Sequence, residues 1–300
     1  MRNTLLAVLL LVCAMPATAR PEGRAIPPAS TTAAATSLTS WSFAVLGDSR
    51  DDPDGVFPAI VDRIHADGSL AFVVHLGDMT HSGGESQLKG FLDASAPIRE
   101  CFFPVIGNHE LGRDKDRHAF KAAFGLKGTA YSFTYRDVHF VILDDASQEF
   151  SPDTLNWLRS DLEQHRKGTR GVERVFVAMH IPPAVPGLKL HVEGDKMQRF
   201  ESGSRHLLEL LREYSTDVVF AGHEHRVQVV DVPGGPRVVI SGAAGAPQGW
   251  RRTPEYGYHR VTVTGDVRIE FVEVKSGNVP NVSAPSVPRA CPEVAEWQQN

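Results

Sequence analysis

The sequence contains little cysteine, no block of basic residues and no long apolar run after residue 19. Three cysteines among 300 residues exclude a disulfide-framework miniprotein. The net charge of -5, from 31 basic and 36 acidic side chains, gives no reason to expect binding to nucleic acid or to an anionic membrane. With 42% hydrophobic residues the chain can bury a sizeable core. Composition therefore predicts a globular protein and excludes collagen, coiled coil and wholesale disorder.

The first 19 residues have the three parts of a secretory signal peptide. Met1 to Asn3 form a short basic start, Leu5 to Met15 an apolar run too short to span a bilayer, and Ala17 to Ala19 a small-residue cleavage site. Cleavage near Ala19 predicts a secreted or periplasmic protein without a membrane anchor. Residues 20–40 contain few large apolar side chains and are predicted to form a flexible leader.

Cleavage would leave two cysteines, Cys101 and Cys291, in an oxidising compartment. Because such a compartment favours pairing, we predict a disulfide that tethers the C-terminal tail to the core. The alternative is two unpaired thiols, one buried before a strand and one in the tail.

Between residues 41 and 276, short apolar runs alternate with helical patterns. Strands are predicted at 41–46, 70–76, 102–106, 131–135, 138–143, 175–179 and 218–222. Helices are predicted at 56–66, at 87–98, from about residue 152 with Ser151 as its N-cap, and at 204–214. Continuous hydrophobicity in the strands indicates sheets that are covered on both faces. We therefore predict one two-sheet α/β domain over 41–276, which ends in hairpin-like strands, and an extended, poorly ordered tail over 277–300.

Five of the predicted strands end at polar side chains that can bind metals. These side chains are Asp48, Asp78, Asn108, His180, His223 and His225. The first three are spaced by 30 residues, the length of one βαβ unit, and the carboxyl ends of parallel strands form the ligand-binding edge of an open sheet. Nitrogen and oxygen ligands without a thiolate suit Zn, Fe or Mn at an open catalytic site better than at a closed structural one.

The ordered motifs GD, GDxxH, GNHE, a lone histidine and GHEH resemble those of the calcineurin-like metallophosphoesterase superfamily, and within it the purple-acid-phosphatase-like branch. The resemblance runs from about Trp41 to Val274. It implies an αββα sandwich of two sheets flanked by helices, with two divalent or mixed-valence metal ions (Fe, Zn or Mn) bridged by one aspartate. The ligands that it implies are Asp78 as the bridge, Asn108, His180 and His223 on one metal, and Asp48 and His225 on the other.

The sequence departs from this family at Arg50. Many members have a histidine two positions after the first aspartate, whereas the Arg50 guanidinium stays protonated and cannot bind a cation. Purple acid phosphatases supply a tyrosine three residues after the bridging aspartate, and His81 stands at that position. We therefore predict His81 as the replacement ligand. The alternative is a solvent-facing loop histidine.

The resemblance implies a phosphoester hydrolase in which a metal-bridging hydroxide makes an in-line attack. Phosphomonoester hydrolysis is the preferred function. Phosphodiester hydrolysis on the same two-metal core, and a non-catalytic phosphoryl-ligand binding protein of the same fold, are the alternatives. The resemblance also implies that His109 protonates the leaving oxygen or stabilises the transition state, and Glu110 is predicted to orient His109 and raise its pKa. Arg50 either contacts a phosphate oxygen or is an ordinary surface arginine.

Two loops are candidate walls of the substrate pocket. Residues 182–200 are long and irregular and contain His191, and residues 242–257 are rich in glycine and contain Trp250 and Arg251. We predict that these three side chains bind the substrate. For both loops the alternative is mere surface decoration.

The remaining histidines fall within predicted secondary structure. His75 and His139 lie in strand patterns, and His165 lies on a helical face. Ordinary polar packing is predicted for them rather than metal binding. The sequence makes no prediction of the oligomeric state.

Overall fold

The computed structural model describes residues 40–52, 55–113, 115–188, 190, 194–248, 254–275 and 297–299. The predicted signal peptide, nearly all of the predicted leader and most of the predicted tail lie outside these residues. Among the helices that the structure describes, none has both the length and the apolar character needed to cross a membrane.

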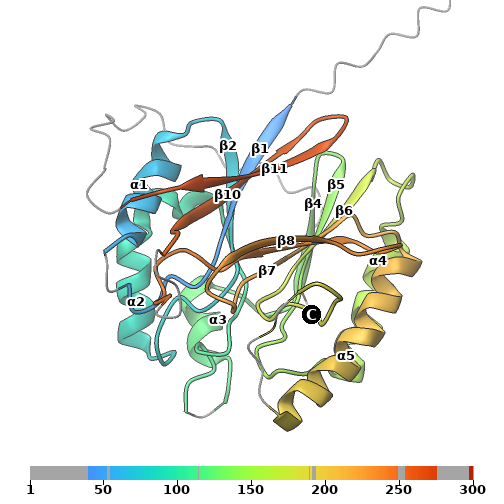
Figure 1. The fold of residues 1–300 in the computed structure, drawn as a ribbon, viewed down its shortest axis with the longest axis horizontal. Coiled ribbons are helices and arrows are strands. Elements are labelled where there is room, and N and C mark those ends of the chain that lie inside the picture. The colour runs from blue at the N-terminus through green and yellow to red at the C-terminus, as the bar shows by residue number, and fades with distance from the viewer. Residues whose placement is uncertain are drawn as a thin grey trace, which may run out of the picture. The chain divides into compact units, whose positions relative to one another are not determined.

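The first sheet has five strands in the order β11-β10-β1-β2-β3 (Figure 1). Its parallel strands are β1 (Trp41–Leu46), β2 (Leu70–His75) and β3 (Phe102–Pro104). The connecting helices are α1 (Phe57–Ala66), α2 (Glu85–Ala94) and the 3₁₀ helix η1 (Ala96–Cys101), and α3 (His118–Phe124) follows β3. The antiparallel strands are β10 (Gly257–Val263) and β11 (Val267–Glu273). Every residue of β1 is buried, as its continuous apolar run predicts.

The second sheet has seven strands in the order β12-β4-β5-β6-β7-β9-β8. Its parallel strands are β5 (Val138–Ile142), β6 (Arg174–Ala178), β7 (Val218–Ala221) and β9 (Arg237–Ser241). Its antiparallel strands are β4 (Tyr131–Tyr135), β8 (Val227–Asp231) and β12 (Trp297–Gln299). The helices α4 (Pro152–Gln164) and α5 (Gly194–Glu213) belong to this half. The predicted N-cap of α4 is confirmed, because the Ser151 hydroxyl accepts a hydrogen bond from the Thr154 amide at 3.1 Å.

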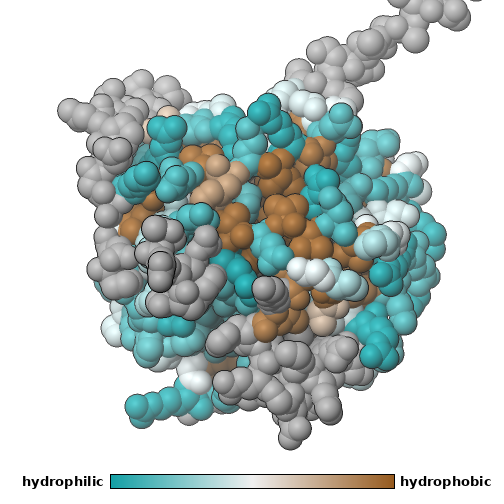
Figure 2. All heavy atoms as spheres, viewed as in Figure 1, coloured by the Kyte–Doolittle hydropathy of each residue, from teal (hydrophilic) through white to brown (hydrophobic). Residues whose placement is uncertain are grey.

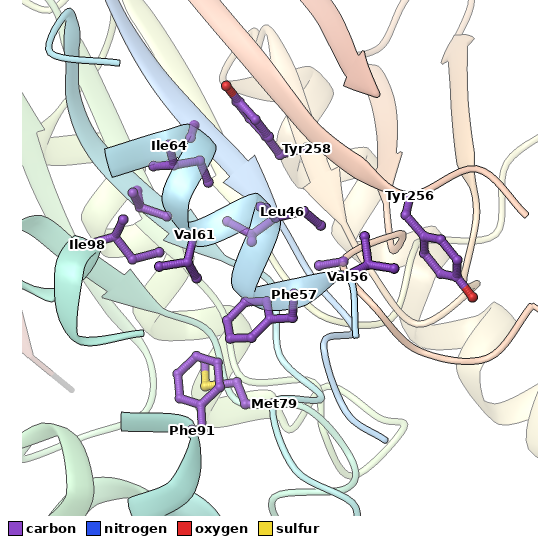
Figure 3. Packing of buried hydrophobic residues seen from close by; sticks show 14 of the residues in the cluster. Leu46, Val56, Phe57, Val61, Ile64, Met79, Phe91, Ile98, Tyr256 and Tyr258 are labelled. Carbon is purple, nitrogen blue, oxygen red and sulfur yellow. The ribbon is translucent and has the colours of Figure 1, made fainter. Parts of the chain in front are cut away.

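A cluster of buried apolar side chains packs the first three helices against the first sheet. Figure 3 shows part of this cluster, in which Phe57 and Val61 of α1 lie near Leu46 of β1. Phe57 also stacks on Phe91 of α2, with the ring centroids 5.5 Å apart. The amphipathic patterns of α1 and α2 therefore fix which face of each helix covers the sheet.

Two further clusters complete the layers. An aromatic-rich cluster fills the space between the sheets, where Phe43 of β1 meets Phe140 of β5 edge to face at 5.3 Å. A third cluster packs α4 and α5 against the outer face of the second sheet, with Leu158 and Leu211 among its fully buried members. The helices α1 to α3 and the helices α4 and α5 lie on opposite sides of the two sheets (Figure 1). The predicted αββα sandwich is confirmed.

Few large apolar side chains are exposed. In the described part of the chain, Val229 of β8 is the only large hydrophobic residue that is exposed. On the face drawn in Figure 2, apolar residues are interspersed with hydrophilic ones.

The structure differs from the sequence prediction in three segments. The helix predicted over 87–98 is divided, because α2 ends at Ala94 and Pro97, which cannot continue an α-helix, lies in η1. Helix α5 begins at Gly194, so the segment 182–200 is not irregular throughout. The predicted tail contributes β12, which pairs with β4.

Cys101 is disulfide-bonded, while its predicted partner Cys291 lies outside the described residues.

Candidate metal centre

The loops that follow β1, β2, β3, β6 and β7 meet around one cavity. Two hydrogen bonds join loops from different sheets: the His180 Nδ1 atom lies 2.7 Å from the Leu76 carbonyl oxygen, and the His223 amide donates to Asp48 Oδ2 at 2.8 Å. The cavity has a volume of about 560 Å³. It is lined by Arg50, Asp78, His109, His223, Glu224, His225, Arg226 and Pro247.

Four of the predicted ligands lie in mutual contact, and we call them the four-donor site: Asp78, Asn108, His180 and His223. Asn108 Oδ1 lies 3.0 Å from both His180 Nε2 and His223 Nδ1. His180 Nε2 lies 3.2 Å from Asp78 Oδ1. Asp78, His180 and His223 each offer one ligand atom within 4.8 Å of the other two, which is the spacing that a metal ion requires of its ligands.

A second group shares Asp78, and we call it the three-donor site: Asp48, Asp78 and His225. His225 Nε2 lies 3.6 Å from Asp48 Oδ1, and His225 Nδ1 donates a hydrogen bond to the Pro247 carbonyl oxygen at 3.1 Å. Asp48 is completely buried, and its Oδ1 atom has no hydrogen-bond partner. A buried carboxylate oxygen without a partner is unfavourable, so this atom fits a cation ligand.

The backbone at these residues is strained. Four of them have φ angles in the left-handed region: Asp48 (60°), Asp78 (54°), His223 (67°) and His225 (40°). Such angles are rare for residues other than glycine and cluster at functional sites. The glycine before His223 is required by space, because a Cβ atom on Gly222 would lie 2.5 Å from Asp48 Oδ2. The sharp turns at the strand ends thus place the side chains at the cavity.

Glu110 holds two of the loops together and does not orient His109, which corrects the sequence prediction. Its side chain is 2% exposed, and its carboxylate accepts hydrogen bonds of 2.8 to 3.0 Å from the backbone amides of Asp78, Met79, Thr80 and Gly107. Burial and the nearby Asp78 carboxylate raise the pKa of Glu110 to about 7. The carboxylate therefore fixes the loop that carries Asp78.

His109 is oriented by a backbone carbonyl group. Its Nδ1 atom donates a hydrogen bond to the His81 carbonyl oxygen at 2.6 Å. Its Nε2 atom lies 3.8 Å from Asp78 Oδ2, at the wall of the cavity. Because Nδ1 is engaged as a donor, Nε2 is the atom that can exchange a proton with a ligand in the cavity.

Arg50 and His81 are both bound to the same carboxylate. Arg50 Nη1 pairs with Asp51 Oδ2, and His81 Nδ1 lies 3.0 Å from that oxygen. The His81 side chain is 64% exposed and belongs to neither ligand group. The structure therefore does not bring His81 to the three-donor site, which corrects the prediction of a replacement ligand. Arg50 reaches the site instead, with Nε 3.4 Å from Asp78 Oδ2.

Asp145 is a buried residue of this region that the sequence analysis missed. It follows β5, and its carboxylate accepts hydrogen bonds from the backbone amides of His180 (3.0 Å) and Ile181 (2.8 Å). Burial raises its pKa to about 7. An acidic residue directly after a predicted strand was the available signal, and it is the same signal that identified Asp48.

The electrostatic field of the cluster favours a positive charge at its centre. Burial alone would lower the pKa of His180, but the Asp78 and Asp48 carboxylates outweigh this effect and raise it to about 10. Burial and the charge of His180 lower the pKa of His223 to about 3. Burial raises the pKa of Asp48 well above its usual range. One positive charge beside Asp78 is thus favourable. Binding of a second positive charge requires that the histidine side chains be neutral.

The other predicted substrate-binding residues, His191, Trp250 and Arg251, lie outside the described residues. The prediction that they contact the substrate therefore stays a prediction.

Comparison with known proteins gives a consistent result over most of the domain. Residues 42–227 match the family model described as calcineurin-like phosphoesterase. Purple acid phosphatase 23 of Arabidopsis thaliana is 29% identical over 201 residues, which are 53% of this chain and 41% of that protein. A probable glycerophosphodiester phosphodiesterase, GpdQ of Arcobacter nitrofigilis, is 24% identical over 163 residues, which are 52% of this chain and 56% of that protein. The chain thus spans about half the length of the curated relatives it matches.

A solved structure shares the fold. Purple acid phosphatase PPD1 from the seeds of yellow lupin (Lupinus luteus) superposes with a TM-score of 0.63 and 16% sequence identity. The superposition covers 81% of this chain and 53% of that chain. At this level of identity the likeness concerns the arrangement of sheets and helices.

Proposed function

This chain belongs to the calcineurin-like phosphoesterase family, which it matches over residues 42–227, and on that premise we propose that it hydrolyses phosphoesters with two bound cations. The observation that carries the proposal is the pair of ligand groups that share Asp78 beside an open cavity. Each group draws its side chains from distant strand ends, so the fold itself assembles the centre.

The residues present fit two metal ions. The donors are carboxylate, amide and imidazole groups, a set that suits Zn, Fe or Mn. Asp78, Asn108, His180 and His223 would hold one ion, and Asp48, Asp78 and His225 the other. The unpartnered Oδ1 atom of Asp48 and the field that raises the pKa of His180 both indicate a place for positive charge.

Two bound cations would supply a nucleophilic water near neutral pH and stabilise negative charge on the phosphoryl group. The residues of the chain would do the rest. With both ring nitrogens protonated, His109 would give its Nε2 proton to the leaving oxygen and become the neutral imidazole, which keeps its remaining proton on Nδ1 in the hydrogen bond to the His81 carbonyl. The Arg50 guanidinium lines the cavity, so it would donate a hydrogen bond to a phosphoryl oxygen.

Phosphomonoesters are the proposed substrate class. A terminal phosphoryl group carries more negative charge than a diester and gains more from the Arg50 guanidinium at the cavity wall. Phosphodiesters are the second candidate, because one of the matched relatives is named as a phosphodiesterase. The same ligand set would serve both reactions.

The test combines metal analysis with a pair of matched substrates. Chelator-treated protein is reconstituted with Zn²⁺ or Mn²⁺, and hydrolysis of 4-nitrophenyl phosphate is compared with that of bis(4-nitrophenyl) phosphate. With the metal ion present in excess we expect two metals per chain and faster cleavage of the monoester. Asp78→Asn should lose metal and lower kcat by more than the roughly 100-fold that is typical when a neighbour of a ligand is lost.

The control is Asp93→Asn, which removes an exposed carboxylate on α2. Its metal content and kcat should equal those of the wild type, and circular dichroism should show that both variants fold. Full activity and metal content in folded Asp78→Asn would refute the proposal.

A further inference from the structure

We infer that the two cation sites are unequal: the four-donor site binds its ion tightly, and Arg50 keeps the three-donor site weak and exchangeable. This inference rests on the proposed function. It concerns what the side chains of this chain do to each site, and it is tested by metal affinity rather than by turnover.

The two sites differ in the number of donors that they offer. In the four-donor site the Asn108 amide oxygen lies 3.0 Å from two imidazole nitrogens, and Asp78 Oδ1 lies 3.2 Å from His180 Nε2. Within the described residues, no further histidine, cysteine or carboxylate joins Asp48, Asp78 and His225. Fewer protein ligands give a weaker site, because solvent must complete the coordination sphere.

The two oxygens of the Asp78 carboxylate face different sites. Its Oδ1 atom faces His180 and therefore belongs to the four-donor site. Its Oδ2 atom is the one left for the three-donor site, and the Nε atom of Arg50 lies 3.4 Å from it. The guanidinium thus lies beside the carboxylate oxygen that would bind the second cation.

Arg50 is held in place and keeps its charge. Its side chain is 16% exposed, and Nη1 is paired with Asp51. A guanidinium stays protonated and offers no lone pair to a metal. At close range and away from bulk water, a fixed positive charge repels a divalent cation strongly. The three-donor site is therefore weakened by both a missing donor and a permanent charge.

Calorimetric titration of the chelator-treated, full-length protein with Zn²⁺ tests this inference. For the wild type we expect two classes of site whose affinities differ by roughly 100-fold, the upper end of the effect of a changed neighbour on metal affinity. One Zn²⁺ per chain should remain after gel filtration. Arg50→His exchanges the charge for an imidazole, and it should tighten the weak class and retain two Zn²⁺ per chain.

Arg50→Gln separates the two causes, since it removes the charge without adding a strong donor. The Zn²⁺ affinity of its weak site should lie between those of the wild type and Arg50→His. Lys121→Gln is the matched control, because it removes a positive charge that lines a different cavity, and its titration should match the wild type. Circular dichroism should confirm that each variant folds.

The outcomes separate this inference from the proposed function. Two tight sites of equal affinity in the wild type, or unchanged affinities in both folded Arg50 variants, would overturn the inference and leave the proposed function standing. An absence of Zn²⁺ binding in folded wild-type protein would overturn both.

Discussion

The centre around Asp78 and the group of His139, Asp161 and His165 both place histidine and aspartate atoms within 4.8 Å of one another. In the second group, His139 lies on β5, Asp161 on α4, and His165 caps the end of α4. All three side chains are buried and none lines the cavity of the candidate metal centre. Their composition is equally suitable for a metal, so the surroundings must distinguish the two groups.

The second group is already satisfied by hydrogen bonds. His139 Nε2 lies 2.8 Å from Asp161 Oδ2, and the Ser132 hydroxyl donates to Asp161 Oδ1 at 2.6 Å. His165 Nδ1 donates to the Asp161 carbonyl oxygen at 2.8 Å, and its ring stacks on that of His139 at 3.9 Å. His139 lies on a regular strand and His165 at the end of a regular helix. This agrees with the polar packing that the sequence predicts for both.

Three features distinguish the candidate metal centre from the second group, and composition is not among them. The centre around Asp78 has left-handed backbone angles, a buried oxygen without a partner at Asp48, and an open cavity. A closed network such as that of Asp161 joins a helix to a sheet and stabilises the fold. The predictions below test this division of roles.

The largest expected effect on stability is that of Asp161→Asn. Removing the charge from a buried, hydrogen-bonded network should lower the free energy of unfolding by roughly 3 to 5 kcal/mol. Denaturant unfolding measures this loss. The Zn²⁺ content and kcat of the folded fraction should not change, because Asp161 is absent from both ligand groups that contain Asp78.

The control for Asp161→Asn is Glu209→Gln on α5, an exposed side chain whose loss should change stability little. A folded Asp161→Asn protein that has lost Zn²⁺ would contradict the assignment of this group to the fold.

The strands were predictable from the sequence because their apolar runs are buried by both neighbouring layers, as in β1. The short strand β12 was not, since three residues pair with β4 through the backbone and leave no hydrophobic pattern. The ligand candidates were predictable because polar residues at strand ends converge on one edge of a sheet.

The directions of the side chains in the site were not predictable. Spacing alone cannot tell that the Glu110 carboxylate turns toward backbone amides, or that His81 turns toward Asp51. Asp145 acts through backbone hydrogen bonds to His180 and Ile181 and therefore carries no motif. Such roles depend on contacts between distant loops, which exist only once the chain is folded.

Glu110→Gln should have the next largest effect, which concerns the affinity for Zn²⁺ rather than the free energy of unfolding. Its carboxylate serves the Asp78 loop as an acceptor, and an amide group would set an N–H against backbone donors. We expect a roughly 10- to 100-fold loss of Zn²⁺ affinity, the range found for residues that orient ligands. Calorimetric titration measures it.

The free energy of unfolding of metal-free Glu110→Gln should fall less than that of Asp161→Asn. The control variant is Gln87→Glu. The side-chain oxygen of Gln87 accepts a hydrogen bond from the backbone amide of the exposed residue Ser82, and this variant should keep the wild-type affinity for Zn²⁺. A Glu110→Gln protein that lost stability but kept full Zn²⁺ affinity would show that the buried carboxylates of Glu110 and Asp161 have the same role. The contrast between the candidate metal centre and the second group would then fail.

The smallest predicted effect is a pH dependence of stability that arises from His180. In metal-free protein the Asp78 carboxylate raises the pKa of His180 from 6.5 to about 10 despite burial. A raised pKa means that the protonated form is stabilised by folding. The contribution is fully present below pH 6.5 and is lost as the pH rises toward 10.

Between pH 7 and 9 the free energy of unfolding of chelator-treated protein should therefore fall through this group by at most about 1.4 kcal/mol per pH unit. Saturation with Zn²⁺ should abolish this part of the slope, because a metal ligand must be the neutral imidazole. His180→Gln should abolish it as well, and guanidinium unfolding at pH 7, 8 and 9 measures all three slopes. Equal slopes in metal-free wild type and His180→Gln would show that the field around Asp78 does not hold a proton at His180.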